Sequence, residues 1–215
     1  MAAGGPMIRL LLADDENLIR TALAALLSLE DDLDVVAQAA SADEALAMAR
    51  RHRPDVAVLD LQMPGLPPPA TGVGGIGVVE ALRKDLPDCA CLIVTGHGRP
   101  GHLKQALAAG VRGFVPKTVS AGVLADVIRT IHNGGRYVDP ELAAEAISAG
   151  DNPLTAREVE VLEHAADGAP VEQVARRASL SPGTVRNYLS SAAAKLGTAN
   201  RHESVQLART HGWIN

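Results

Sequence analysis

Five side chains in the sequence could together handle a phosphoryl group. Each lies at or just past the C-terminal end of a short apolar run: Asp14-Asp15 after MIRLLLA, Asp60 in DVAVLD, Thr95 in CLIVT and Lys117 after GFVP. Runs of this kind, separated by helix-like stretches, predict the buried strands of a parallel sheet. Ligands bind outside the carboxyl ends of such strands. We therefore expect three carboxylates, a hydroxyl and an ammonium group to meet in one pocket.

These residue types favour metal-assisted phosphoryl chemistry. Mg²⁺ prefers oxygen ligands, and Asp15 and Asp60 could bind it directly while Asp14 acts through water. A carboxylate beside Mg²⁺ can attack phosphorus and become an acyl phosphate. Thr95 would donate a hydrogen bond to a phosphoryl oxygen, and Lys117 would pair with its charge. A single acid at a strand end is typical of a solvated loop, whereas this ordered set favours the pocket.

The elements that must position this pocket occupy the first 132 residues, where strand-like and helix-like patterns alternate. We expect strands at 8–12, 34–38, 55–59, 91–95 and 113–115, and helices at 16–28, 42–51, 76–84, 100–109 and 120–132. Such alternation predicts an α/β fold with a five-stranded, doubly wound parallel sheet and helices on both of its faces.

The pattern changes after this region. Asn133-Gly134-Gly135 ends the last helix, Asp139-Pro140 can start a short connecting helix, and the stretch from Gly150 to Pro153 is typical of a linker. Only helical patterns follow, at 155–167, 171–178, 182–196 and 201–211. The sequence thus predicts a first domain at 7–132, a linker at 133–152 and an all-α four-helix domain at 153–215.

Composition limits the classes of function. With 47% hydrophobic and 21% charged residues, the chain can bury a core in each domain. Only 2% of the residues are aromatic, which argues against binding single-stranded nucleic acid by stacking. The sequence holds no apolar run of about 18 residues, so we expect a cytoplasmic protein without a membrane partner. Cys89 and Cys91 form neither a disulfide framework nor a zinc site.

A helix-turn-helix is expected at 171–196, where a second helix begins at Ser181-Pro182. The stretch 173–202 contains no acidic residue although the chain carries a net charge of -5, which suits a polyanionic partner. The N-terminal part of the second helix would enter the major groove of double-stranded DNA. The residues expected to face DNA are Thr184, Arg186, Asn187 and Ser190, with Lys195 and Arg201 as phosphate contacts.

The motifs ADDE, LDLQMPG, VTG and GFVPK resemble the receiver domain of bacterial two-component response regulators, which has a flavodoxin-like fold. The resemblance implies phosphorylation at Asp60 by a sensor histidine kinase. It also implies Mg²⁺ on Asp15, Asp60 and the backbone carbonyl of Gln62, and a conformational switch through Thr95 and Phe114. Alternatively, Phe114 would be an ordinary aromatic residue of the core without a role in switching.

The C-terminal motifs LTAREVEVL, TVRNYLS, KLG and NR resemble the DNA-binding domain of LuxR/NarL-type regulators (the NarL/FixJ class). GRPGHLKQALAAGVRGF and HGWI are similar to the DesR-type subgroup. The resemblance implies a transcription regulator rather than an enzyme. Its implied partners are promoter DNA, the sensor kinase, RNA polymerase and a second copy of the chain on activation.

Two departures from the receiver pattern keep alternatives open. The loop after MPG is longer than usual by about seven residues, and Pro116 precedes Lys117. The insertion, 66–75, would act as a lid; its Gly72-x-Gly74-x-x-Gly77 string also matches the dinucleotide fingerprint, although the strand and acidic contexts of that motif are missing. An atypical regulator controlled by a ligand or by dimerisation is one alternative. A Mg²⁺-dependent phosphohydrolase is another, but the second acid such enzymes use is replaced here by Gln62.

Overall fold

The computed structural model describes residues 7–65, 74–96, 98–148 and 152–214. The chain forms two compact units, one built mainly from residues before Ala144 and the other mainly from Ala144 onward. Most of the insertion expected at 66–75, including Gly72, lies outside the described residues. No helix within the described ranges combines the length and the apolar character that crossing a bilayer requires.

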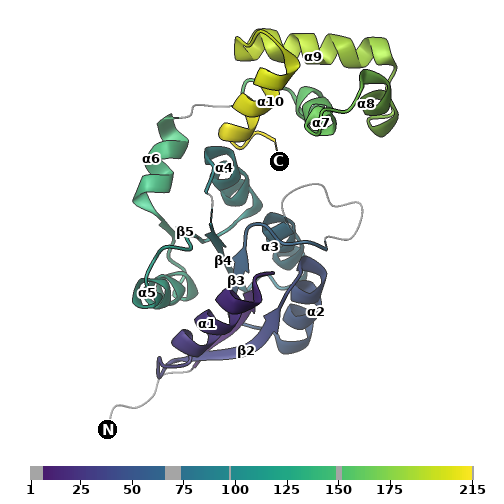
Figure 1. Cartoon of the computed structure of the whole chain (residues 1–215). Coiled ribbons are helices and arrows are strands. Elements are labelled where there is room, and N and C mark those ends of the chain that lie inside the picture. Colours follow the sequence, from purple (N-terminus) through teal and green to yellow (C-terminus); the bar gives the residue numbers. More distant parts are fainter. Residues whose placement is uncertain (1–6, 66–73, 97, 149–151, 215) are drawn as a thin grey trace. The chain divides into compact units, whose positions relative to one another are not determined.

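The first unit is a parallel α/β sheet, as the alternation predicted (Figure 1). Its strands are β1 (Ile8–Ala13), β2 (Leu33–Ala39), β3 (Val56–Asp60), β4 (Ala90–Thr95), β5 (Gly113–Pro116) and β6 (Tyr137–Val138), in the order β2-β1-β3-β4-β5-β6. Every neighbouring pair is parallel. The sequence predicted five strands; β6 adds a short sixth at the β5 edge, inside the segment expected to be a linker. Two residues are too few to show an alternation that sequence reasoning can detect.

Five helices connect these strands: α1 (Asn17–Leu27), α2 (Ala42–His52), α3 (Gly74–Asp85), α4 (Pro100–Ala109) and α5 (Ala121–His132). The residues that build the main core are alternate positions of β1, β3 and β4 packed against α1 and α5, among them Leu10, Leu12, Val58, Leu92, Val94, Leu27, Leu124 and Ile128. The helices α2 and α3 pack against each other and against the sheet. Burial on both faces explains why these strands are nearly continuous apolar runs.

The start of α3 lies against the chain that follows β3. The Gly75 N–H donates to the carbonyl of Leu61 at 3.0 Å. A Cβ at Gly75 would collide with the Asp60 carbonyl oxygen, and one at Gly74 would collide with that of Met63. The helix begins two residues before the expected start at residue 76, and these glycines form its first turn. Close packing accounts for them without a nucleotide.

A short helix, α6 (Pro140–Ser148), follows β6, with Asp139 Oδ1 accepting the N–H groups of Glu141 and Leu142. The second unit then contains α7 (Ala156–Ala165), α8 (Val171–Arg177), α9 (Pro182–Leu196) and α10 (Arg201–Thr210), which confirms the expected four helices. Ser181 caps α9, and Pro182 occupies its first turn, where a missing N–H costs nothing. Two clusters form its core, around Leu162, Ala192 and Val205 and around Val161, Val174 and Val185.

Candidate functional site

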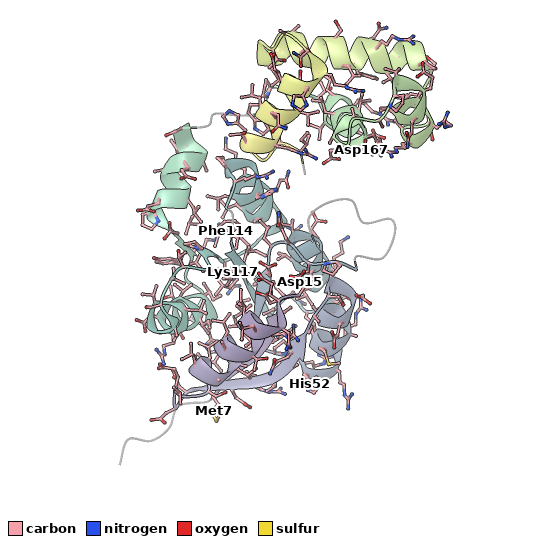
Figure 2. All side chains as sticks on the ribbon, in the orientation of Figure 1. Met7, Asp15, His52, Phe114, Lys117 and Asp167 are labelled. Carbon is pink, nitrogen blue, oxygen red and sulfur yellow. The ribbon has the colours of Figure 1, made fainter. Side chains whose placement is uncertain are left out.

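The expected pocket residues meet at one edge of the sheet. Asp14 follows β1, Asp60 and Thr95 end β3 and β4, and Lys117 follows β5. Asp14, Asp15 and Asp60 each offer a carboxylate oxygen, and these three atoms lie within 4.8 Å of one another. The Lys117 Nζ lies 2.8 Å from Asp14 Oδ2 and 3.3 Å from Asp60 Oδ1. Figure 2 shows Lys117 and Asp15 at the same end of the unit. The topology thus brings together at one edge five residues that lie up to 103 positions apart in the sequence.

Asp60 is nearly enclosed, with 6% of its side chain exposed. Burial raises the pKa of its carboxyl to about 6, Lys117 opposes that rise, and the nearby Asp14 charge adds to it. The N–H of Gln62 donates to Asp60 Oδ2 at 3.2 Å and helps to hold the carboxylate in place. At neutral pH, the Asp60 carboxyl is therefore mostly ionised, and the Gln62 N–H orients it.

Lys117 is held by both its backbone and its side chain. Its N–H donates to the Thr95 carbonyl at 2.7 Å, and Pro116 pairs with Thr95 in the β4–β5 ladder. Burial lowers the pKa of the Lys117 ammonium, but its hydrogen bonds to Asp14 and Glu16 outweigh burial and raise it above the ordinary value. The ammonium remains charged in the pocket. Pro116 ends β5, and the ammonium of Lys117, directly after it, contacts Asp14 and Asp60.

Thr95 and Phe114, the two residues of the expected switch, are both buried. Thr95 ends β4 with 1% exposure, while Phe114 lies in β5 opposite Ile93 of β4 and Val138 of β6. The Phe114 carbonyl accepts the N–H of Asp139 at the start of α6. The ring is thus part of the core, and the Phe114 backbone joins the sheet to the start of α6.

The donor set of the pocket fits a hard divalent cation. Three carboxylates converge, one of them exposed (Asp15), and only the Lys117 ammonium offsets their charge among the contacts described. Oxygen donors at this spacing, with one side open to water, are what Mg²⁺ uses in phosphoryl-transfer sites. The backbone carbonyl of Gln62, two residues after Asp60, was expected to complete the set.

Sequence reasoning assigned no role to Glu16, which is part of the same site. Its Oε1 lies 3.0 Å from Lys117 Nζ. The signal was available, because Glu16 directly follows the acidic pair in the ADDE motif. Its partner, 101 residues away, could only be found from the fold.

The four expected base-facing residues all lie in the first two and a half turns of α9. Arg186, Asn187 and Ser190 are exposed, while Thr184 is half-buried and its hydroxyl lies 2.8 Å from Ser181 Oγ at the helix cap. Val185 between them is fully buried in the α8–α9 core. The helix therefore turns its apolar face inward and leaves a polar face open.

Lys195 and Arg201 make contacts within the second unit. Lys195 Nζ lies 2.7 Å from Glu158 Oε2, and Glu158 is buried at the start of α7. The Arg201 guanidinium donates to the carbonyls of Ala169 and Gly168, at 2.7 and 3.3 Å. Both side chains thus connect helices of the unit, which the expectation of simple phosphate contacts did not include.

A parallel α/β unit with an acidic pocket at its carboxyl edge, joined to a helix-turn-helix unit, defines a DNA-binding response regulator. Two family models agree: "Response regulator receiver domain" matches residues 10–129, and "Bacterial regulatory proteins, luxR family" matches residues 152–208. The chain belongs to the LuxR family of response regulators.

Full-length relatives support this membership. The transcriptional regulatory protein DesR of Bacillus subtilis (strain 168) is 37% identical over 208 residues, covering 97% of this chain and 100% of DesR. The regulator UhpA of Escherichia coli (strain K12) is 36% identical and covers 96% of this chain and 100% of UhpA. Among solved structures, the response regulator ChrA of a heme-sensing two-component system is 29% identical with a TM-score of 0.58, covering 98% of this chain and 100% of ChrA.

Proposed function

We propose that this regulator is switched by phosphorylation of Asp60, with a sensor histidine kinase as phosphodonor and Mg²⁺ as cofactor. The observation that carries the proposal is the convergence of Asp60 with two further carboxylates and the Lys117 ammonium at the sheet edge. In the reaction, an Asp60 carboxylate oxygen forms a bond to phosphorus while the bond from phosphorus to the donor's leaving group breaks.

The residues of the pocket have separate roles in this proposal. Asp14, Asp15, Asp60 and the Gln62 carbonyl would hold Mg²⁺, which supplies positive charge for the phosphoryl oxygens when bound. Lys117 would pair with a phosphoryl oxygen, and Thr95 would donate its hydroxyl to another. The movement of Thr95 would be passed to Phe114, whose backbone leads to α6. Gln62 provides no second acid, so we propose that the protein does not turn over phosphate as an enzyme.

Promoter DNA is the proposed partner of α9. Arg186 can donate two hydrogen bonds to guanine. The Asn187 amide can form two hydrogen bonds with adenine, donating one and accepting the other. Thr184 and Ser190 would add shorter contacts along the same face. Arg201 and Lys195 would contact phosphates with those N–H groups that make no hydrogen bond within the unit. The Lys195 side chain is 36% exposed, which leaves it accessible to DNA.

Activation would proceed through a homodimer that recruits or obstructs RNA polymerase at the promoter. Many helix-turn-helix proteins bind DNA as dimers, and the two half-sites of their operators match the two-fold symmetry of the dimer. Sizing the protein with and without beryllofluoride and Mg²⁺ tests this part. A protein that never changes its size or its DNA affinity with the mimic would behave as the atypical regulator does, without phosphorylation.

The central test is labelling by acetyl phosphate in the presence of Mg²⁺, followed by intact mass. The wild type should gain one phosphoryl group. Asp60→Asn keeps the shape of the side chain but removes the nucleophile, so the added mass should disappear. Undiminished labelling of the variant would assign the acyl phosphate to another residue and would refute the proposal.

A further inference from the structure

Glu16 contributes a carboxylate that the proposed chemistry does not use. Its Oε1 lies 3.0 Å from Lys117 Nζ, the same ammonium that contacts Asp14 and Asp60. The Glu16 side chain is 60% exposed, whereas those of Asp14 and Asp60 are 7% and 6% exposed. Glu16 therefore reaches Lys117 from the solvent side of the pocket.

The backbone fixes Glu16 in this place. Its N–H donates to Asp14 Oδ1 at 2.9 Å, and its carbonyl accepts the N–H of Arg20 in α1 at 3.0 Å. Although Glu16 is the N-cap residue of α1, its side chain accepts no capping hydrogen bond within that described first turn. The carboxylate is thus directed at Lys117 and not at the helix end.

Competition follows from the number of donors on the ammonium. Lys117 has three N–H bonds, and in this structure three carboxylates surround them. A phosphoryl group on Asp60 would need one of these bonds and would also bring negative charge toward Glu16. Because Asp14 is buried beside Lys117 and Glu16 is exposed, the contact with Glu16 is the one that opposes the incoming group.

We propose that Glu16 is a positioning residue that holds Lys117 in the unphosphorylated pocket and competes with the phosphoryl group for its ammonium. Glu16 thereby limits the rate and the extent of Asp60 phosphorylation. This inference rests on the proposed phosphorylation of Asp60 and adds to it a residue that sets how readily the site accepts the group.

Three variants of the full chain test the competition. Glu16→Gln removes the charge and keeps the shape. Glu16→Asp keeps the charge but withdraws it from Lys117 by one methylene group. Asp88→Asn, the control, removes an exposed carboxylate that precedes β4 and therefore lies at the opposite end of that strand from Thr95. Each is labelled with acetyl phosphate and Mg²⁺ and followed by intact mass, and the loss of the label is then timed after removal of the donor.

Exposed ion pairs contribute modestly, so we expect Glu16→Gln to be labelled about 2–5 times faster and to keep its phosphoryl group longer. Glu16→Asp should show most of the same gain, and Asp88→Asn should match the wild type. The gain should persist at about 0.5 M NaCl, where the effect of a distant charge is screened but a direct contact is less so. Equal urea midpoints for all four proteins would exclude a change in folding as the cause.

The outcomes separate this inference from the proposed function. If the wild type is labelled but Glu16→Gln reacts at the same rate, the competition is wrong and the phosphorylation of Asp60 stands. If only Glu16→Gln gains and Glu16→Asp matches the wild type, a general charge effect replaces the contact. A wild type that takes no phosphoryl group under these conditions overturns both.

Discussion

The bond between Lys195 and Glu158 leads to a quantitative prediction about the second unit. Glu158 Oε2 accepts hydrogen bonds from the Thr155 N–H, the Thr155 hydroxyl and Lys195 Nζ, at 2.6, 2.9 and 2.7 Å, and Oε1 accepts the Ser191 hydroxyl at 2.6 Å. The carboxylate therefore joins the N-terminus of α7 to the last two turns of α9. We consider the variant Lys195→Met, which keeps the length of the stem and removes the charge.

The magnitude follows from the pKa of Glu158. Burial alone would raise this pKa, but the hydrogen bond from Lys195, followed by those from Ser191 and Thr155, lowers it from 4.5 to about 2. At 1.36 kcal/mol per unit of pKa, this net shift, in which the contacts outweigh burial, corresponds to about 3 kcal/mol. Lys195 is the leading contributor, but 36% of its side chain is exposed and water screens it. We therefore expect Lys195→Met to lower the free energy of unfolding of this unit by about 1–2 kcal/mol.

Trp213 provides the assay, because it is the only tryptophan of the chain and packs against the α7–α9–α10 core. Its fluorescence during urea unfolding reports on the second unit alone. The matched control is Arg157→Met, which breaks an exposed Arg157–Glu160 pair on α7, the helix that carries Glu158. This change should lower the free energy of unfolding by less than about 0.5 kcal/mol.

The pH dependence of the same measurement checks its cause. Since the folded pKa of Glu158 lies below the unfolded one, its contribution is fully present above pH 4.5 and is lost as the pH falls toward 2. The difference between Lys195→Met and the wild type should therefore shrink across this window. If the two variants lose equal stability at pH 7, or the difference stays constant down to pH 2, the reasoning about this contact is wrong.

Two further predictions concern DNA recognition and the packing of α3. Arg186→Ala should weaken binding to the cognate duplex by about 1–3 kcal/mol and relax the base preference there, as measured by fluorescence anisotropy on specific and random DNA; equal losses on both duplexes would assign Arg186 to phosphate contact. Gly75→Ala should cost about 1–3 kcal/mol in urea unfolding and reduce labelling of Asp60, because its Cβ meets the Asp60 carbonyl. Gly122→Ala in α5, where a Cβ meets nothing within 4 Å, should be neutral or stabilising, and an equally harmful Gly122→Ala would remove steric contact as the explanation.

The sequence was sufficient to predict β1 to β5 and the residues that meet at the carboxyl ends of these strands. Long apolar runs mark strands buried on both faces, and in a parallel sheet the residue after each run is placed at the same edge. Asp60 and Lys117 could therefore be assigned to one site before the fold was known. The helices of the second unit could be predicted as well, because their starts are marked by local capping signals. These signals are Ser181-Pro182 at α9 and Thr155 with Glu158 at α7, and each acts within one turn.

Partners of long side chains could not be predicted in this way. The contacts of Lys195 with Glu158 and of Glu16 with Lys117 join residues 37 and 101 positions apart, and no local pattern encodes which carboxylate a lysine selects. The sequence also failed to predict that α3 begins at Gly74, for a related reason. Gly74 and Gly75 look like a flexible loop in sequence, and only the neighbouring backbone shows that their lack of a Cβ is needed for packing.

The connectivity of the two units also has a consequence for how the chain folds. All five strand pairings in the first unit are parallel: four join strands separated by one helix, and the β1–β3 pairing spans α1, β2 and α2. In the second unit, consecutive short helices pack against one another across short turns. Non-local pairing slows folding because loop closure precedes any gain from contacts. This topology favours a DNA-binding unit that reaches its native packing while the sheet of the receiver is still assembling.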